Sequence, residues 1–301
     1  MLPCTEQEGT DVVKVAFCGL GQMGEPMAAR LLDGSQELVV WNRSAERGDA
    51  LVERGARRAA SPAEAAAGTD VVITMLSTPG ALEEVVFGHE GVASGIEAGA
   101  TLVEMSTVGP DAVRSLAERL PDGVDVLDSP VLGSVSAATD GTLKLFVGGP
   151  EDQVERLRPV LEHLGTVNHV GPLGSGAAMK LVANSTLATL MTGLGEALAL
   201  ADGLGLDTSK VLGLLAESPI GVTAKSKKEN IESGTYSPNF KLALAVKDVE
   251  LVTEAARGAG LELRLGPAAQ AWLEAAEEAD LGAMDYSAVI AHIRGTEASL
   301  S

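Results

Sequence analysis

The chain has 301 residues, enough for two domains of ordinary size. Its 42 acidic and 22 basic residues give a formal net charge of −20, which argues against nucleic acid or an anionic membrane surface as a partner, because both attract clustered Lys and Arg. Hydrophobic residues make up 46% of the chain, as in a globular protein, and this excludes a largely disordered one.

Residues 1–10 predict a disordered polar tail without the apolar run of a signal peptide. The two cysteines, Cys4 and Cys18, form no disulfide framework and are expected as free thiols in the cytoplasm. The uncharged stretch 181–195 is shorter than the about 18 residues that a membrane span needs. It is expected to pack in the core or in a dimer surface.

Residues 11–172 alternate strand and helix patterns, which imply parallel βαβ units. We therefore expect an α/β domain built on a doubly wound parallel sheet. Strands are predicted at 12–18, 37–41, 70–76, 101–105, 124–127 and 142–147, and helices at 22–33, 47–54 and 111–120.

After residue 172 the strand patterns stop. We expect an all-α domain over 173–301, joined to the first by a long interdomain helix and serving substrate binding and dimerisation. Helices are predicted at 177–203, 207–217, 240–258, 263–280 and 286–294.

A GxGxxG motif follows the first predicted strand and opens the first predicted helix, the context that marks a Rossmann-type dinucleotide-binding turn. Its first glycine permits the tight turn, the second lets the backbone approach a pyrophosphate, and the third lets the helix pack on the strand. Free N–H groups at the helix start bind phosphate oxygens. The expected cofactor-binding residues are Gly19, Leu20, Gly21, Gln22, Met23 and Gly24.

The end of the second predicted strand bears on which dinucleotide binds. An NAD site usually has Asp or Glu about 20 residues after the motif, whereas this chain has Asn42, Arg43 and Ser44. Arg43 can pair with a 2′-phosphate and stack on adenine, and Asn42 and Ser44 can donate further hydrogen bonds. The residues favour NADP(H); the alternative is that Arg43 is a solvated loop cation.

Lys180 and Asn184 lie four residues apart, on one face of the long predicted helix. Desolvation and a nearby nicotinamide cation would lower the pKa of Lys180 and fit it for proton transfer. The alternative is a lysine at a helix start that extends its ammonium into solvent. The histidines show no metal-ligand spacing, so no metal is expected. Lys225, Lys227 and Lys228 are expected on a solvated helix face.

Taken together, these motifs resemble the β-hydroxyacid dehydrogenase family, from Val12 to Arg294. Its members include 3-hydroxyisobutyrate dehydrogenases and glyoxylate/succinic semialdehyde reductases, and the Asn-Arg-Ser segment is more similar to the NADPH-using reductases. The matching segments are 17–28, 75–77, 105–107, 128–134, 140–143 and 174–184, followed by residues 240 and 247–248.

The resemblance implies an oxidoreductase in which Lys180 is the general acid of carbonyl reduction and the base of alcohol oxidation, while Asn184 positions the substrate oxygen. It also implies a homodimer or homotetramer. On the cofactor side it places Met75, Leu76, Ser77, Thr107 and Lys247; on the substrate side it places Leu132, Gly133, Ser134, Phe240 and Asp248.

Leu132 departs from the family, because many members carry a Ser or Thr there that bonds the substrate carboxylate. The lost hydrogen bond to a charged group is worth about 1.5–3 kcal/mol. We expect NADPH-dependent reduction of a small aldehyde or keto acid, with the carboxylate held by backbone N–H groups, or of a less polar substrate.

Two alternatives remain for the function. An imine reductase shares the architecture but usually lacks the lysine. A non-catalytic NADP-binding sensor or scaffold typically loses it as well. Resemblance to 6-phosphogluconate dehydrogenase is weaker, since Leu187 stands where that enzyme would carry Glu.

Overall fold

The computed structural model describes residues 13–34 and 36–300; the predicted tail and Cys4 lie outside them. The chain forms two compact units. The first contains the described residues before Thr107 together with Val113–Ser175, and the second contains Thr107–Ala112 and the described residues from Gly176 onward. The segment Thr107–Ala112 thus groups with a unit distant from it in sequence.

The first unit is built on a sheet whose strands follow the order β3-β2-β1-β4-β5-β6-β8-β7, with β9 paired to β8. The pairs from β3 to β6 are parallel, as in the register Val15↔Leu38 on one side of β1 and Val15↔Val71 on the other. The strands are β1 Lys14–Cys18, β2 Glu37–Trp41, β3 Arg57–Arg58, β4 Val71–Thr74, β5 Thr101–Glu104, β6 Asp125–Asp128, β7 Val131–Leu132, β8 Leu143–Gly148 and β9 Gly165–Gly171.

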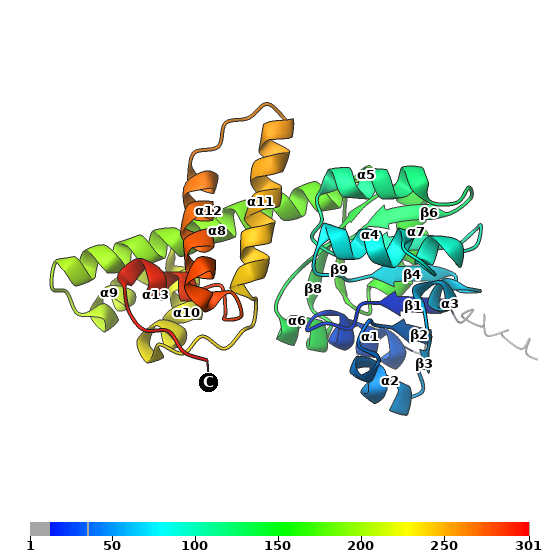
Figure 1. The fold of residues 1–301 in the computed structure, drawn as a ribbon, viewed down its shortest axis with the longest axis horizontal. Coiled ribbons are helices and arrows are strands. Elements are labelled where there is room, and N and C mark those ends of the chain that lie inside the picture. The colour runs from blue at the N-terminus through cyan, green and yellow to red at the C-terminus, as the bar shows by residue number, and fades with distance from the viewer. Residues whose placement is uncertain (1–12, 35, 301) are drawn as a thin grey trace, which may run out of the picture. The chain divides into compact units, whose positions relative to one another are not determined.

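Helices of the first unit accompany this sheet (Figure 1). Two begin with proline directly after a capping side chain: the Ser61 hydroxyl accepts from the Glu64 N–H, and the Thr78 hydroxyl accepts from the Ala81 N–H. Aliphatic side chains and Phe17 fill the core. The helices are α1 Gly24–Asp33, α2 Asp49–Glu53, α3 Pro62–Ala66, α4 Pro79–Phe87, α5 Pro110–Arg119, α6 Val135–Asp140 and α7 Glu151–Leu161.

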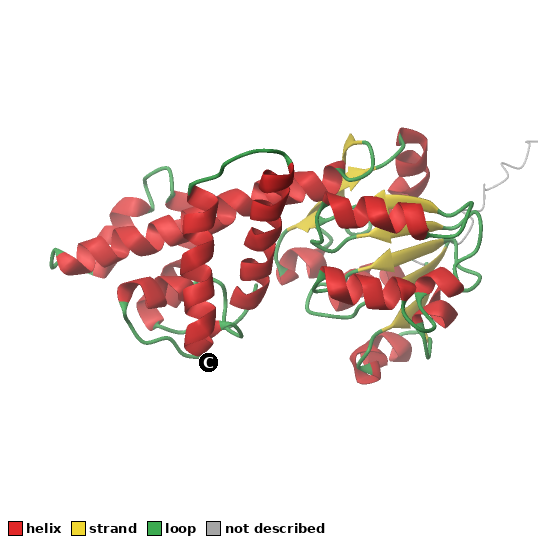
Figure 2. Ribbon diagram, turned by 45° about the horizontal axis from the view of Figure 1, so that its top comes forward, coloured by secondary structure: helices red, strands yellow, loops and turns green. Residues whose placement is uncertain are grey.

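The second unit is helical, and the strands that the structure describes all belong to the first (Figure 2). Its core gathers aliphatic residues such as Met191, Leu242 and Leu273. The Asp207 side chain caps α9 by accepting from the Lys210 N–H. The helices are α8 Ser175–Gly203, α9 Thr208–Leu215, α10 Gly221–Ser233, α11 Leu242–Gly258, α12 Leu265–Ala276 and α13 Ala288–Arg294, with a π-turn at Glu277–Leu281.

The predicted fold class is confirmed, with one correction at the sheet edge. Strand β8 runs antiparallel to β6 and β7, so the sheet is not parallel throughout. Only Gly133–Thr142 connects β7 to β8, too short a segment for the crossover of a dozen or more residues that parallel strands need. None of the helices in the described part of the chain combines the length and apolarity that a membrane crossing requires.

Candidate active site

The glycine-rich turn after β1 has two positions that the fold fixes and one that it leaves open. Gly19 has φ +108°, and a Cβ there would lie 2.3 Å from the Met75 carbonyl oxygen. A Cβ on Gly24 would lie 1.9 Å from the Gly19 oxygen, whereas one on Gly21 would meet nothing within 4 Å. Gly21 is exposed, and no side chain caps α1 at Met23. Uncapped N–H groups beside open space suit a phosphate group of a dinucleotide.

Asn42 ties this turn to the end of β2. Its Oδ1 accepts from the Leu20 N–H at 2.9 Å, and its Nδ2 donates to the Ser44 carbonyl at 3.0 Å. The amide therefore uses a donor and an acceptor within the protein, while Arg43 and the Ser44 side chain are exposed. Arg58 of β3 lines a small crevice with Leu20 and Asn42 and forms an ion pair with Asp49. The sequence analysis did not name Arg58 as a site residue.

A buried acid holds the loops that follow β4 and β5. Glu104 Oε1 accepts from the Ser106 N–H at 2.6 Å, and Oε2 bonds the Thr74 hydroxyl. The Ser106 hydroxyl in turn accepts from the Leu76 N–H at 2.8 Å. This network fixes the segment Met75–Ser77, where Met75 and Leu76 are half-buried and Ser77 is exposed. Glu104 was not predicted because a lone acid in an apolar strand gives no pattern, and Ser106 was placed in the matching segment 105–107 but given no role.

The predicted substrate loop follows β6 in the same unit. Leu132 is half-buried and pairs with Lys144 across β7 and β8, and Gly133 is exposed. Ser134 caps α6, accepting from the Ala137 N–H at 3.4 Å, and its hydroxyl lies 2.7 Å from that of Ser136.

Asp128, at the end of β6, is buried and fixes the segment that precedes α8. Its Oδ1 accepts from the Gly174 N–H at 2.7 Å. The sequence analysis placed Asp128 in the matching substrate segment but gave it no role.

In the second unit, polar contacts link Asn184 to Asp248 and Lys247 to Thr107, all of them predicted site residues. Asn184 Nδ2 donates to Asp248 Oδ2 at 2.6 Å, and both side chains are buried. Lys247 Nζ donates to the Thr107 carbonyl at 2.5 Å and lies 2.7 Å from Asp248 Oδ1. Asp248 Oδ1 is thus held by an ion pair with Lys247, and no further donor to this buried oxygen occurs among the described residues. Its remaining lone pairs suit a substrate hydroxyl or a neighbouring ammonium.

Lys180 and Asp248 have shifted acidities. Burial lowers the pKa of Lys180; the charge of Asp248 opposes this effect, and the charge of Lys247 adds to it. Burial raises the pKa of the Asp248 carboxyl, opposed by Lys247 and then by Lys180. The ammonium of Lys180 therefore gives up its proton more readily than a lysine in water.

Further residues considered in the sequence analysis are Lys225, Lys227, Lys228, Cys18 and the histidines. Lys225 and Lys228 are exposed, but Lys227 pairs with the fully buried Asp285, so the interpretation of all three as solvated is wrong for Lys227. Burial raises the pKa of the Cys18 thiol to about 12. No cluster of metal-ligating side chains occurs within residues 13–34 and 36–300.

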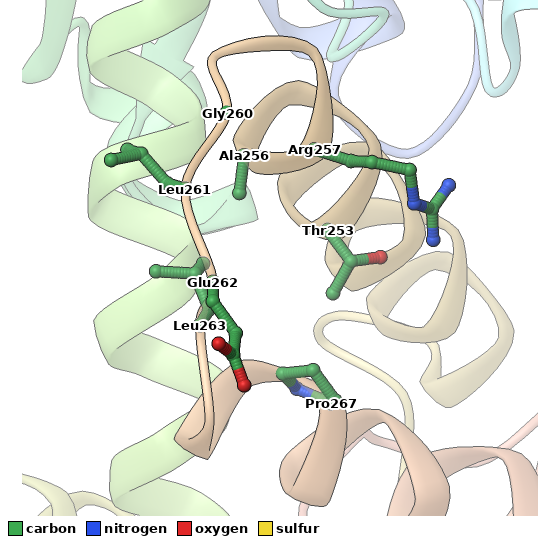
Figure 3. Close-up of a pocket in the computed structure, with 8 residues that line it drawn as sticks. All are labelled: Thr253, Ala256, Arg257, Gly260, Leu261, Glu262, Leu263 and Pro267. Atoms are coloured by element: carbon green, nitrogen blue, oxygen red, sulfur yellow. The ribbon is translucent and has the colours of Figure 1, made fainter.

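A cavity of about 420 Å³ lies where the chain turns from α11 toward α12 (Figure 3). Its lining contains no predicted site residue. The lining residues are Thr253, Ala256, Arg257, Gly260, Leu261, Glu262, Leu263 and Pro267.

Two family models together cover most of the chain. The model for the NAD binding domain of 6-phosphogluconate dehydrogenase matches residues 14–173. The model for the NAD-binding domain of NADP-dependent 3-hydroxyisobutyrate dehydrogenase matches residues 174–293.

Named relatives cover nearly the whole chain as well. The 3-sulfolactaldehyde reductase of Escherichia coli is 34% identical, over 93% of this chain and 95% of its own. The 3-hydroxyisobutyrate dehydrogenase of Pseudomonas aeruginosa is 33% identical, over 94% and 99%. The chloroplastic glyoxylate/succinic semialdehyde reductase 2 of Arabidopsis thaliana is 31% identical, over 98% and 83%.

Solved structures show the same architecture. The 3-hydroxyisobutyrate dehydrogenase of Mycobacterium tuberculosis, solved with L-serine, is 29% identical with a TM-score of 0.82, covering 94% of this chain and 99% of its own. An imine reductase of Streptomyces aurantiacus is also 29% identical, covering 93% and 99%, but its TM-score is 0.62.

Proposed function

The chain belongs to the β-hydroxyacid dehydrogenase family and is an NAD(P)-dependent dehydrogenase or reductase; on that premise we propose that it reduces a small aldehyde or keto acid with NADPH, using Lys180 as the proton donor. One observation carries the proposal: a half-buried Lys180 on α8, with lowered pKa, in the same unit as the hydrogen-bonded pair Asn184–Asp248. Relatives named for glyoxylate, succinic semialdehyde and 3-sulfolactaldehyde indicate the size and anionic character of the substrate.

The first unit would hold the dinucleotide. The N–H groups of the turn at Gly19–Gly24 would bind the pyrophosphate, since Gly21 leaves room for close approach. The exposed guanidinium of Arg43 would pair with the 2′-phosphate. When bound, NADPH supplies the hydride for the carbonyl carbon.

In the second unit, Lys180 would transfer a proton to the substrate oxygen as that oxygen gains negative charge. A carboxylate can only accept hydrogen bonds, so Asp248 fixes the orientation of the Asn184 amide, with its NH₂ group toward Oδ2. The second N–H of that group and Asn184 Oδ1 then remain for the substrate oxygen and the Lys180 ammonium.

Lys247 has a role that this geometry makes more specific. It was expected to contact the cofactor, and its ammonium donates to the Thr107 carbonyl. We assign Lys247 to holding the Thr107 segment in position, in addition to any contact with the cofactor, because one ammonium carries three donors.

A substrate panel tests the proposal. Purified enzyme is assayed for oxidation of NADPH and of NADH with glyoxylate, succinic semialdehyde, methylmalonate semialdehyde, tartronate semialdehyde, uncharged aldehydes and imines. We expect turnover with an anionic aldehyde or keto acid and a lower KM for NADPH. In Arg43→Ala, the KM for NADPH should rise about tenfold, a loss of about 1.4 kcal/mol, and the KM for NADH should stay unchanged.

The same panel separates the alternatives. Turnover of imines alone would favour an imine reductase, which has structural support in the Streptomyces aurantiacus enzyme. Tight NADPH binding without turnover of any carbonyl would favour a sensor or scaffold. An Arg43→Ala enzyme with an unchanged KM for NADPH would contradict the assignment of the 2′-phosphate site.

A further inference from the structure

A buried ion pair lies outside the residues assigned above. Lys227 of α10 donates from Nζ to Asp285 Oδ1 at 2.7 Å. The Lys227 side chain is 12% exposed, and the Asp285 side chain is fully buried. Hydrogen bonds from Lys227 and Ser287 hold the pKa of the Asp285 carboxyl below its usual value in spite of the opposing effect of burial.

The carboxylate also holds the chain segment that contains Phe240. Its Oδ2 accepts from the N–H groups of Asn239 and Phe240, each at 3.3 Å. The Ser287 hydroxyl and N–H donate to Oδ1 at 2.5 and 3.1 Å. Both oxygens of Asp285 thus accept hydrogen bonds, and the two donors to Oδ2 are the backbone N–H groups of Asn239 and Phe240.

Tyr286, the residue after Asp285, also holds Phe240, through a backbone hydrogen bond and a ring contact. The Tyr286 N–H donates to the Phe240 carbonyl at 2.7 Å, and the two rings meet edge to face with centroids 5.4 Å apart. Lys227 Nζ lies 4.7 Å from the centroid of the Tyr286 ring, so the Lys227 ammonium contacts both Asp285 and Tyr286.

The same segment also contacts the residues at the start of α11. The Leu242 N–H donates to the Met284 carbonyl at 2.9 Å, and Lys241 forms a β-bridge with Asp285. Helix α11 begins at Leu242 and carries Lys247 and Asp248 in its first half. The segment 284–287 thus fixes both the Phe240 backbone and the entry of this helix.

Burial of two charges adds little stability compared with an apolar pair of the same size, because desolvation offsets their attraction. Stability alone therefore does not account for a buried pair beside a predicted substrate residue. We propose that Lys227 and Asp285 are positioning residues for the reductase site, which hold Phe240 where it contacts the substrate. This inference rests on the proposed function, together with the family resemblance that places Phe240 on the substrate side.

Steady-state kinetics with matched variants test this role. Asp285→Asn and Lys227→Met should each raise the KM for the carbonyl substrate about tenfold, equivalent to about 1.4 kcal/mol. The KM for NADPH should stay unchanged, and kcat should change less than the substrate KM. Lys227→Arg should restore most of the substrate KM, since it keeps the charge and the donor. In a Phe240→Ala background, Lys227→Met should add no further increase.

The control is an ion pair of the same unit that includes no predicted site residue. Arg294 donates to Asp202 at 2.7 Å, with side-chain exposures of 9% and 34%. Asp202→Asn should lower the melting temperature and leave the substrate KM unchanged. If Asp285→Asn does not fold, Lys227→Met gives the same kinetic comparison, because it leaves the backbone donors to Asp285 in place.

The possible results distinguish the positioning role of Lys227 and Asp285 from the proposed reductase function on which it rests. If Phe240→Ala raises the substrate KM but the Lys227 and Asp285 variants change only the melting temperature, as Asp202→Asn does, the positioning role is overturned and the proposed function stands. If Phe240→Ala leaves the substrate KM unchanged, the positioning role is overturned together with the assignment of Phe240. Absence of carbonyl reduction in the wild-type enzyme overturns both proposals.

Discussion

The carboxylate of Asp248 and the ammonium of Lys247 have opposite effects on the pKa of Lys180. Burial favours its neutral form, Asp248 favours the charged form, and Lys247 opposes Asp248. A proton donor works best when its pKa lies near the working pH. This arrangement moves a lysine in that direction with residues from two helices, α8 and α11.

A pH dependence follows from the direction of that shift. Carbonyl reduction needs protonated Lys180, so kcat/KM for reduction should fall as the pH rises through a pKa below the ordinary lysine value of about 10.4. Alcohol oxidation needs neutral Lys180, so its rate should rise over the same range. Asp248→Asn removes the charge that raises this pKa and should shift both profiles to lower pH.

Profiles of kcat/KM measured in both directions check this expectation. An Asp248→Asn enzyme with a lower rate but an unmoved profile would assign Asp248 to orientation of Asn184 alone. Reduction that does not slow at alkaline pH would exclude Lys180 as the donor.

At the scale of elements, we expect different roles for two glycines of the glycine-rich turn: Gly24 is needed for folding and Gly21 for cofactor binding. Gly24→Ala places a methyl group 1.9 Å from the Gly19 oxygen, and such overpacking should lower the free energy of unfolding by about 1–3 kcal/mol. Gly21→Ala meets open space, so its stability should match the wild type while its affinity for NADPH falls at least about tenfold. Thermal melting and cofactor titration of the two variants check the difference. Equal cofactor affinity in Gly21→Ala would show that the pyrophosphate does not approach this residue.

Elements with a clear period were predictable from the sequence, and elements defined by tertiary contacts were not. The predicted strand at 37–41 and the helix at 177–203 correspond closely to β2 and α8, because long apolar or periodic runs decide them. The sequence analysis expected a helix face at Lys225, Lys227 and Lys228 but gave α10 no bounds, because its residues are mostly polar and carry no clear apolar stripe.

The residues of the site could be predicted from local motifs, but the long-range contacts between them could not. Motif spacing predicted Lys180 and Asn184, but not the bond from Asn184 to Asp248, which joins residues 64 positions apart. The role of Lys227 was misjudged for a related reason: a basic run looks solvated until the fold places Asp285 against one member. Long-range polar pairing leaves no local signal in the sequence.

At the scale of the whole molecule, α8 offers a surface for self-association. An exposed apolar stripe runs along one face, with Val182 at 63%, Leu190 at 42% and Leu200 at 65% exposure, and Leu204 at 67% follows directly after the helix. At about 100° per residue the three helical positions fall within an arc of about 80°. Apolar surface of this kind marks interaction sites in soluble proteins, so we expect a homodimer or a larger homo-oligomer.

Light scattering on the wild type and on Leu190→Glu and Leu200→Glu tests this surface. The wild type should have at least twice the mass of one chain, and the glutamate variants should dissociate because they place charge in the contact. Val222→Glu, at an apolar residue of α10 that is 84% exposed and lies outside the stripe, is the matched control and should not alter the mass. A monomeric wild type would contradict the expectation.

The two units have separable tasks in this proposal: the first binds the dinucleotide and the second donates the proton. Lys180→Met therefore provides the most direct test, since methionine keeps the length and apolar body of the side chain but has no proton to give. Single-turnover oxidation of bound NADPH by the best substrate of the panel is measured together with the NADPH dissociation constant. We predict an unchanged dissociation constant and a rate of hydride transfer reduced about 10²–10⁴-fold, the usual contribution of a general acid. A Lys180→Met enzyme that reduces the carbonyl at the wild-type rate would contradict the proposed mechanism.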